Sequence, residues 1–379
     1  MTKLKIQNVG PIKNVEFELK RFNFFIGRQS SGKSTIAKII SYCMWLEKEV
    51  LTHPDNQDKL SYYENDFLWE LENFHSMHNF FLNHPNIYYE SEYITISYSE
   101  GKCSINLKRK NKYKRHKVLY VPAERSMAIR DVILTKENYL RSFSIDFNTA
   151  RNFFSTKQRL DLLHLGIQYY KEYKDGETVN KIKAKDNSYE IKLDDASSGL
   201  QSIVPAVVTI AFFSKMFYKD DNETRTLNVK QDSDRKHIRN YIRDYFNISD
   251  TDKDQMIDRL LSTHKTCFVL EEPEQNLYPL TQREFLNFIV SCCNGQRKHN
   301  LSVTTHSPYI INQLNLLIKA HDKNIKIDGA SIPFNDLNVY AVQDGTIRDL
   351  KVKNEGIHLI DTERLSEDIN NIYETYSQL

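Results

Sequence analysis

One short stretch constrains this chain more than any other, namely GRQSSGKST, from Gly27 to Thr35. An apolar segment, Phe22 to Ile26, leads directly into it, and we expect a helix from Lys33 to Lys48. A glycine, four residues and Gly-Lys-Ser between a strand and a helix is the pattern of a phosphate-binding loop, or P-loop. Gly27 and Gly32 allow backbone angles that a Cβ forbids. The loop amides can therefore point inward at phosphate oxygens.

The residues of this loop have separate expected roles. Lys33 is expected to reach the β- and γ-phosphates of a nucleoside triphosphate, and Ser34 to hold Mg²⁺. The following helix offers the positive end of its dipole to the anion. The alternative is a Gly-Ser-rich turn before a helix. The residues expected to surround the nucleotide are Gly27, Arg28, Gln29, Ser30, Ser31, Gly32, Lys33, Ser34 and Thr35.

A second apolar segment ends in two carboxylates, in the sequence CFVLEEPEQNLYP of residues 267–279. This is a Walker B pattern, in which Glu271 is expected near Mg²⁺ through a water and Glu272 polarises the attacking water as a general base. Two acids at the end of a buried strand are costly unless a cation or water partners them. The alternative is a strand that ends at a charged turn.

Two further segments complete the pattern. SVTTHSPYII, residues 302–311, places His306 at the end of a strand, where ligands lie in open α/β sheets. There it can contact the γ-phosphate and sense hydrolysis. DDASSGLQS, residues 194–202, places Ser198 and Gly199 at a helix N-terminus, which forms an anion site. The alternatives are a packing histidine and an ordinary N-cap.

In this order, GRQSSGKST, ASSGLQ, LEEPEQNL and TTHS resemble the ABC-type ATPase heads of the SMC, RecF and OLD (overcoming-lysogenisation-defect) group. VLYVPAERS, residues 118–126, resembles the strand-plus-PAxR segment of OLD-like bacterial ATPases. The resemblance covers residue 1 to about 320 and is weak in two helical insertions. Leu200 in place of a signature glycine and Glu271 in place of an aspartate also resemble the OLD-like branch. Arg125 lies where a Q-loop glutamine is usual, and we expect it to contact phosphate or a Mg²⁺-bound water, or else to form a salt bridge in its turn.

The resemblance implies a fold, cofactors and an assembly. The fold is an α/β P-loop NTPase, an ABC-type head with an N-terminal antiparallel β lobe, a parallel-sheet core and helical insertions. Two heads of this group close head to tail around two ATP molecules with Mg²⁺. Ser198 and Gly199 would then act on the partner's nucleotide. Lys33, Glu272 and His306 would act within their own subunit as catalytic residues, with Ser34 and Glu271 as the metal-binding residues there.

We interpret the chain as one ATPase domain, 1–379, with helical insertions at 51–90 and 214–263. Residues 131–173 are predicted to be mostly helical, and 320–379 to hold strands and a helix. A strand–helix–strand–helix order from 266 to 318 favours a parallel sheet. Hairpins are predicted for the paired segments Tyr93–Tyr98 with Cys103–Leu107 and Val179–Lys183 with Tyr189–Leu193.

Charge and hydropathy limit the partners. The net charge of +2 exerts no global attraction toward nucleic acid or anionic membranes. The longest nearly apolar run, Ile203–Phe213, is interrupted by Pro205 and falls short of the ~18 residues of a membrane span. With no apolar signal core at the start, we expect a cytoplasmic protein without membrane contact. The basic run KRKNKYKRHK, residues 108–117, suits nucleic acid or an acidic partner protein, or is a solvated hairpin arm.

The resemblance also suggests a biological role. It implies a sensor or regulator in bacterial anti-phage defence or a DNA transaction, coupled to a separate effector such as a nuclease or toxin. The acids after Val339 do not form the Glu and Asp-x-Asp pattern of a Toprim nuclease, so we expect any nuclease on another chain. The alternatives are a RecF-like DNA-repair clamp and an ATP-binding scaffold or immunity protein with negligible turnover.

Overall fold

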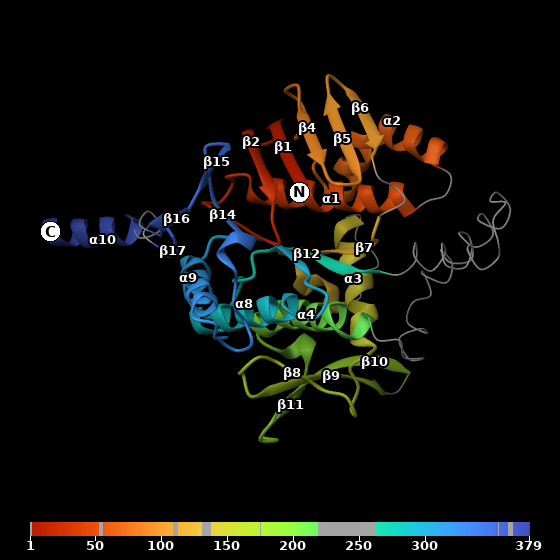
Figure 1. Ribbon diagram of the computed structural model, residues 1–379. Coiled ribbons are helices and arrows are strands. Elements are labelled where there is room, and N and C mark those ends of the chain that lie inside the picture. The colour runs from red at the N-terminus through yellow and green to blue at the C-terminus, as the bar shows by residue number, and fades with distance from the viewer. Residues whose placement is uncertain are drawn as a thin grey trace.

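A six-stranded sheet lies at the centre of the molecule in the computed structural model, which describes residues 2–52, 56–108, 113–130, 138–174, 176–218, 263–354, 356–362 and 367–379 (Figure 1). The strand order is β15-β14-β3-β13-β12-β7, and every neighbouring pair is parallel except β14 with β15. The predicted parallel core is therefore confirmed. Its strands are β3 (Phe22–Ile26), β7 (His116–Val121), β12 (Lys265–Glu271), β13 (Asn300–Thr305), β14 (Leu337–Gln343) and β15 (Thr346–Asp349).

Each face of this sheet carries its own hydrophobic core. Successive side chains of a strand point to opposite faces, and Phe24 and Phe25 on β3 accordingly belong to different cores. Phe25 packs with α1 (Lys33–Thr52). Phe24 packs with the helices on the other face, which are α4 (Ser198–Ser214), α8 (Pro279–Cys293) and α9 (Pro308–Asp322). Burial on both faces fixes the sheet and the loops at its carboxyl edge.

An antiparallel β lobe covers α1 on the side away from the central sheet, as Figure 1 shows. Its order is β2-β1-β4-β5-β6, and α2 packs beside β6. The lobe and the hairpin of β5 and β6 are as predicted. Its elements are β1 (Thr2–Val9), β2 (Ile12–Leu19), β4 (Asn86–Glu90), β5 (Ile94–Ser99), β6 (Lys102–Leu107) and α2 (Asn56–His75).

The remaining elements lie around these central layers. A second antiparallel sheet, β11-β10-β9-β8, lies below α4 in the view of Figure 1, and the helix α10 projects from the left side. These elements are α3 (Asn138–Arg151), β8 (Leu160–Asp161), β9 (Ile167–Lys174), β10 (Glu177–Ala184), β11 (Glu190–Lys192), β16 (Lys351–Asn354), β17 (Ile357–Ile360) and α10 (Glu367–Gln378). The predicted hairpin at 179–193 corresponds to β10 and β11.

Three predictions about the connecting regions need correction or stay outside the described residues. The mostly helical prediction for 131–173 is wrong after α3, because β9 pairs along its whole length with β10. The predicted helical insertion 51–90 contains α2 but ends in strand β4, whose main chain completes the edge of β1. The predicted insertion 214–263 falls outside the described residues between 219 and 262.

Helix α4 is the most apolar helix near the site. Among the described residues, Ser198–Tyr218 is the one helical stretch long and apolar enough to cross a membrane by length and composition. Most of it is buried inside the protein, where it packs against α3 and α8. A core helix passes the same test of length and hydropathy, so the apolar sequence of α4 follows from burial.

Candidate functional site

The loop between β3 and α1 is shaped by packing that only glycine permits at two positions. Gly32 has a φ of +103°, and a Cβ there would lie 2.3 Å from Cδ1 of Ile12. A Cβ on Gly27 would lie 2.3 Å from the carbonyl oxygen of Val342 in β14. Ser30 also has a positive φ, of +59°. The loop is therefore held closely between the β1–β2 turn and β14.

Lys33 is folded into this loop. Its Nζ donates hydrogen bonds to the carbonyl oxygens of Gly27, at 2.9 Å, and Arg28, at 2.8 Å. Burial lowers the pKa of Lys33 to about 8, although Glu272 and Glu274 act in the opposite direction. The ammonium thus occupies the concave side of the turn, where loop amides and an anion would meet. Ser34, the next residue, is exposed at the start of α1.

The register of the parallel strands brings the other predicted residues to the same edge of the sheet. Thr304 on β13 pairs with Glu271 on β12, and Thr305 pairs with Ile26 on β3. The P-loop, the two carboxylates and His306 therefore leave the sheet at one level. This is the edge at which open α/β sheets bind ligands.

Glu272 and His306 form a direct contact. Nε2 of His306 lies 3.0 Å from Oε1 of Glu272, with the imidazole N–H as donor to the carboxylate. The backbone amide of His306 donates to a carboxylate oxygen of Glu274. Glu272 has a φ of +41°, an unusual conformation for a residue with a Cβ. Backbone strain of this kind gathers at functional sites.

Glu271 fits the predicted role beside a metal ion. It is buried, and its Oε1 has no hydrogen-bond partner among the described residues. Burial raises the pKa of Glu271 to about 7. An unpartnered buried carboxylate oxygen is costly without a cation or a water, so the residue suits Mg²⁺ or a metal-bound water. The described residues hold no group of three or more His, Cys, Asp or Glu side chains that could hold a metal ion.

The predicted signature residues lie at the exposed beginning of α4. Ser198 is the first residue of the helix and is exposed, while the preceding Ser197 is the N-cap, whose side chain accepts from the amide of Leu200 at 3.5 Å. A Cβ on Gly199 would lie 2.8 Å from the carbonyl oxygen of Asn276, in the loop after Glu272. Ser198 is thus available to another molecule, and Gly199 packs against its own Walker B loop.

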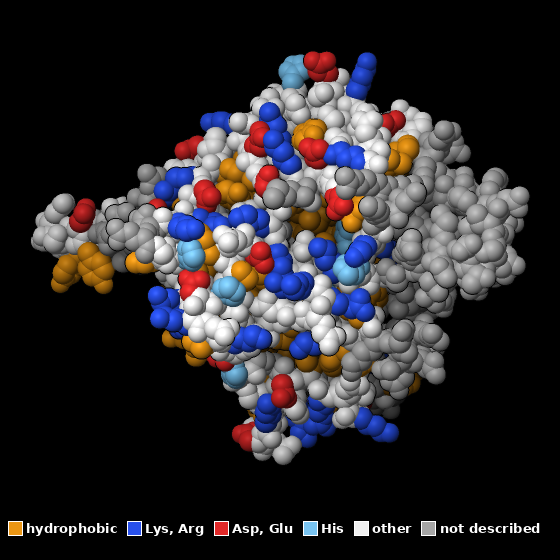
Figure 2. All heavy atoms as spheres, in the orientation of Figure 1, with side chains coloured by type: hydrophobic (Ala, Val, Ile, Leu, Met, Phe, Trp, Pro, Cys, Tyr) orange, Lys and Arg blue, Asp and Glu red, His pale blue; other side chains and the backbone are white. Residues whose placement is uncertain are grey.

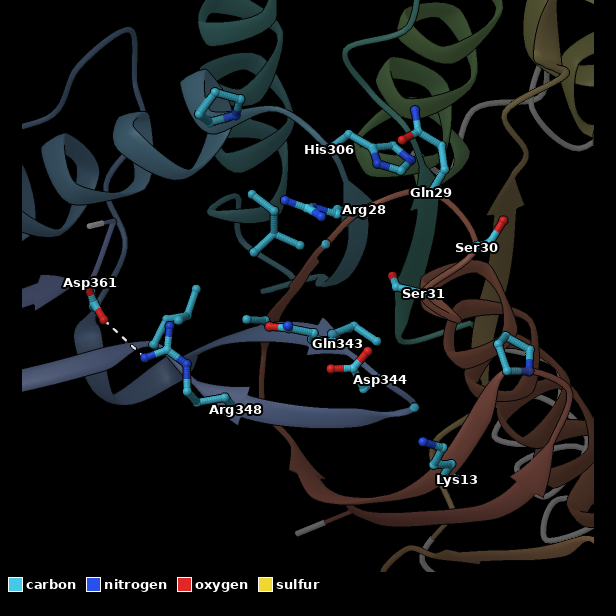
Figure 3. Close-up of a pocket in the computed structure, with 18 residues that line it drawn as sticks. Lys13, Arg28, Gln29, Ser30, Ser31, His306, Gln343, Asp344, Arg348 and Asp361 are labelled. Atoms are coloured by element: carbon cyan, nitrogen blue, oxygen red, sulfur yellow. Dashed lines mark hydrogen bonds and ion pairs between the residues drawn. The ribbon is translucent and has the colours of Figure 1, made fainter. Parts of the chain in front are cut away.

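A cavity of about 770 Å³ adjoins the P-loop, within the size range of small-molecule sites. Figure 3 places His306 and Gln29 together at one end, and Lys13 with Asp344 at the other. Arg348, paired with Asp361 at 3.3 Å, lines its side. The sequence does not predict that residues from 341 onward line the site. An Asp-Gly dipeptide at 344 and 345 is a hairpin signal, but its position beside the P-loop follows only from the pairing of β14 with β3.

The side chain of Arg125 does not make the contacts that the sequence predicts. Its side chain is fully buried, and its guanidinium donates to four backbone carbonyls. The prediction of a phosphate or water contact is therefore wrong, because the donors are directed at main-chain oxygens. The alternative of an exposed salt bridge is wrong for the same reason. The acceptors are the carbonyl oxygens of Ser202 (3.0 Å), Pro122 (3.3 Å), Glu271 (2.9 Å) and Glu272 (2.9 Å).

The described part of the basic run 108–117 is largely occupied by contacts within the protein. Residues 109–112 lie outside the described residues. Tyr113 is buried and its hydroxyl lies 3.2 Å from Nδ1 of His116, so it offers no stacking surface for a base. Lys108 pairs with Glu90, and Lys117 with Asp146 at 2.7 Å. On the face shown in Figure 2, Lys and Arg are interspersed with Asp and Glu. This pattern favours the structural alternative for the described residues.

Comparison with known proteins finds a likeness to solved structures, among them an SMC head domain and two ATP-binding cassettes. No protein-family model matches the chain, and no curated protein matches its sequence. The SMC head domain from Thermotoga maritima is 11% identical, with 93% of this chain and 98% of that chain covered and a TM-score of 0.39. The dimeric post-hydrolysis state of the ATP-binding cassette MJ0796, bound to ADP and Pi, is 13% identical, with 93% and 99% covered and a TM-score of 0.32. The ADP conformation of MJ1267, an ATP-binding cassette of an ABC transporter, is 11% identical, with 98% of each chain covered and a TM-score of 0.33.

These sequence identities and TM-scores are too low to indicate an activity. The fold class rests on the structure itself, which has an α/β architecture with a parallel core and a P-loop between β3 and α1. The expected P-loop NTPase fold is therefore confirmed.

Proposed function

We propose that this protein is an ABC-type ATPase that binds ATP with Mg²⁺ at the P-loop and hydrolyses it to ADP and phosphate. The observation that carries the proposal is the 3.0 Å contact between Glu272 and His306, at the sheet edge from which the P-loop also leaves. A nucleotide-binding loop with no hydrolytic role would not need a carboxylate and an imidazole aligned there.

Each side chain has a definite task in this reaction. Glu272 accepts the proton of the attacking water, and the N–H of His306 orients the carboxylate. Lys33 leaves the carbonyls of Gly27 and Arg28 to bind the β- and γ-phosphates of the substrate. Ser34 and Glu271 would hold Mg²⁺, which when bound would neutralise charge on the phosphate oxygens.

The cavity beside the P-loop accommodates the rest of the substrate. Its walls offer Lys13 and Asp344 together with the apolar Ile26 and Pro11. A mixed polar and apolar lining suits a nucleoside, which has an apolar ring face and polar edges. We assign the base and ribose of ATP to this space.

A homodimer completes the site in this proposal. Ser198 is exposed at the N-terminus of α4, where a free hydroxyl and helix amides can bind the partner's γ-phosphate. Large apolar side chains are also exposed at the start of α8 and α9, close in sequence to the Walker B loop and His306. They are Tyr278 (76% exposed), Leu280 (53%) and Tyr309 (48%). A patch of this kind suits a surface that a second copy covers.

The biological role is a further part of the proposal, supported by the sequence resemblance to OLD-like ATPases. The protein acts in the cytoplasm as a sensor or regulator whose closed, ATP-bound dimer engages a separate effector, in anti-phage defence or a DNA transaction. ATP shifts the population toward the closed dimer because its additional contacts exist only there. The alternative is an ATP-binding scaffold with negligible turnover. If the protein were such a scaffold, wild type and Lys33→Ala would release phosphate at the same background rate.

Mixing two inactive variants tests the shared site. Lys33→Ala lacks a working P-loop but keeps its signature, whereas Ser198→Arg keeps its P-loop but blocks its signature. Each is expected to be inactive alone. In a mixed dimer, the P-loop of the Ser198→Arg subunit meets the signature of the Lys33→Ala subunit, so one of two sites is restored. We expect an equimolar mixture to recover on the order of a quarter of wild-type phosphate release, because half of random dimers are mixed.

The control is a mixture of Lys33→Ala with the double variant Lys33→Ala/Ser198→Arg, which contains no complete site in any dimer. Each variant is first checked for an unchanged melting temperature. Full activity of Ser198→Arg alone, or no recovery in the first mixture from two folded and separately inactive variants, would overturn the shared site.

A further inference from the structure

Arg125 joins three segments that are far apart in the sequence. It belongs to a short 3₁₀ turn, Arg125–Arg130, after β7. Its Nε donates to the carbonyl of Ser202 in α4, while Nη1 and Nη2 donate to the carbonyls of Glu271 and Glu272 at 2.9 Å each. Because the guanidinium is planar and its donors are rigidly spaced, the two carbonyls of the Walker B segment and the one of α4 are held at fixed positions to each other.

The main chain of Glu272 is the part of the site that most needs such support. Its φ of +41° is unfavourable for a residue with a Cβ. The amide of Glu272 donates to the carbonyl of Thr304 at 2.9 Å, and its own carbonyl accepts from Arg125. Both main-chain groups are therefore tied, which keeps the carboxylate directed at His306.

The α4 end of this link lies one helical turn from the signature. Pro205 lies inside α4 and has no N–H for the carbonyl of Gln201, so the backbone hydrogen bonding of the helix is interrupted at this turn. Arg125 binds the neighbouring carbonyl, that of Ser202. At the first turn, Gly199 packs against the carbonyl of Asn276. A shift of α4 would therefore displace the Walker B loop through two contacts, one made by Arg125 and one made by Gly199.

We propose that Arg125 is a positioning residue that couples the signature helix α4 to Glu272 of the same subunit. This rests on the proposed function, in which the signature of each subunit contacts the partner's nucleotide. Closure of the dimer onto α4 is transmitted through Arg125 to the main chain of Glu272. Each subunit then holds its own general base more firmly when its signature has engaged the opposite ATP, so that hydrolysis at the two sites is linked.

The test compares Arg125→Lys with a matched control, Arg21→Lys. Arg21 also donates to main-chain carbonyls, those of Cys293 at 2.6 Å and His299 at 3.3 Å, but at the opposite end of β3 from the P-loop. Lysine keeps the charge and loses the planar fork of donors. The measurements are steady-state phosphate release, binding of a fluorescent ATP analogue, and hydrogen–deuterium exchange of residues 271–277.

We expect Arg125→Lys to lower kcat at least tenfold, while KM and the dissociation constant of the analogue change by less than threefold. Amide exchange in 271–277 should rise at least tenfold, and the ATP-induced change in α4 should no longer be accompanied by one in 271–277. Arg21→Lys should leave all of these within twofold of wild type. An Arg125→Lys variant that behaves as Arg21→Lys does would overturn the proposal.

If Arg125→Lys does not fold, amide hydrogen exchange of the intact wild-type protein is measured instead. There the Glu272 amide should exchange at least a hundredfold more slowly than the exposed amide of Ser198, and an equal rate would overturn the link. If wild-type protein releases no phosphate, the proposed function fails, but the exchange data still decide the link. Faster exchange in 271–277 of Arg125→Lys, without a change in Arg21→Lys, supports it even then, and unchanged exchange rejects it.

Discussion

The imidazole of His306 and the carboxylate of Glu272 meet at 3.0 Å although 34 residues separate them in the sequence. They come from the ends of two adjacent parallel strands, β13 and β12, whose register pairs Thr304 with Glu271. The register of the two strands therefore holds the carboxylate and the imidazole together through the fold itself. Such preorganisation lowers the reorganisation needed during the reaction.

Replacing Glu272 by glutamine should separate binding from hydrolysis. Glu272→Gln keeps the size of the side chain and an oxygen that can accept from His306, but it cannot take a proton. We expect phosphate release to fall by about a hundredfold or more, while ATP still binds. Size-exclusion chromatography with light scattering should then show an ATP-dependent dimer. A protein that stays monomeric at saturating ATP would contradict the shared site.

Replacing His306 by alanine should lower kcat by roughly ten- to a hundredfold. The Glu272 carboxylate would lose its only side-chain hydrogen bond recorded among the described residues and would no longer be fixed in direction. Nucleotide affinity should change little. His321→Ala, an exposed histidine on α9, serves as the control and should retain wild-type kcat. Equal rates for the two variants would remove His306 from the mechanism.

A methyl group on Gly27 should disable the P-loop. Its Cβ would lie 2.3 Å from the carbonyl oxygen of Val342, a main-chain atom of β14 that cannot rotate away. We expect Gly27→Ala to lose nucleotide binding and roughly 1–3 kcal/mol of the free energy of unfolding. Gly295→Ala, where the nearest atom is 3.4 Å from the new Cβ, should be close to neutral. Chemical denaturation and binding of a fluorescent ATP analogue measure both effects, and normal binding by Gly27→Ala would contradict the tight packing.

The stability of the protein should depend on pH through Glu47. This residue is buried in α1, where it accepts a hydrogen bond from the hydroxyl of Tyr89, and burial raises the pKa of its carboxyl to about 7. Between the ordinary pKa of a glutamate and about 7, the folded state holds a proton that the unfolded state has released. The stability that this residue contributes is therefore present below the ordinary pKa and is lost as the pH rises through 7.

Glu47→Gln isolates this effect because its amide oxygen still accepts from Tyr89 and never ionises. The free energy of unfolding of the variant relative to wild type should increase from pH 6 to pH 8, by an amount on the order of 1–3 kcal/mol. Urea unfolding at each pH gives the difference. Glu16→Gln, an exposed carboxylate paired with Lys3, is the control. A difference that does not vary with pH would show that Glu47 stays ionised in the folded protein.

Local sequence was enough to predict the conformation of the continuous segments that make up the candidate site. The P-loop, the paired carboxylates and the end of the next strand each join a strand to a turn. Their residue types determine both the backbone conformation and the polar side chains present there. Gly32, for example, has the positive φ that only glycine adopts easily. The helix that begins at Lys33 and the exposed start of α4 follow from the same kind of signal.

The errors arose where burial decides the role of a side chain. Arg125 and Tyr113 have the chemistry of ligand-binding residues, and only the packing around them turns one toward carbonyl groups and the other toward His116. Residues 167–174 form β9 because β10 offers a complete partner strand.

The sequence alone determined the conformation of the loop between β3 and α1 and the identity of the acidic and basic groups, since these depend on neighbouring residues. Only the tertiary structure decided which groups meet. The alignment of β12 with β13 joins Glu272 to His306, and the pairing of β14 with β3 forms the cavity wall. Both depend on the long-range burial of the two sheet faces, a property that no short segment carries.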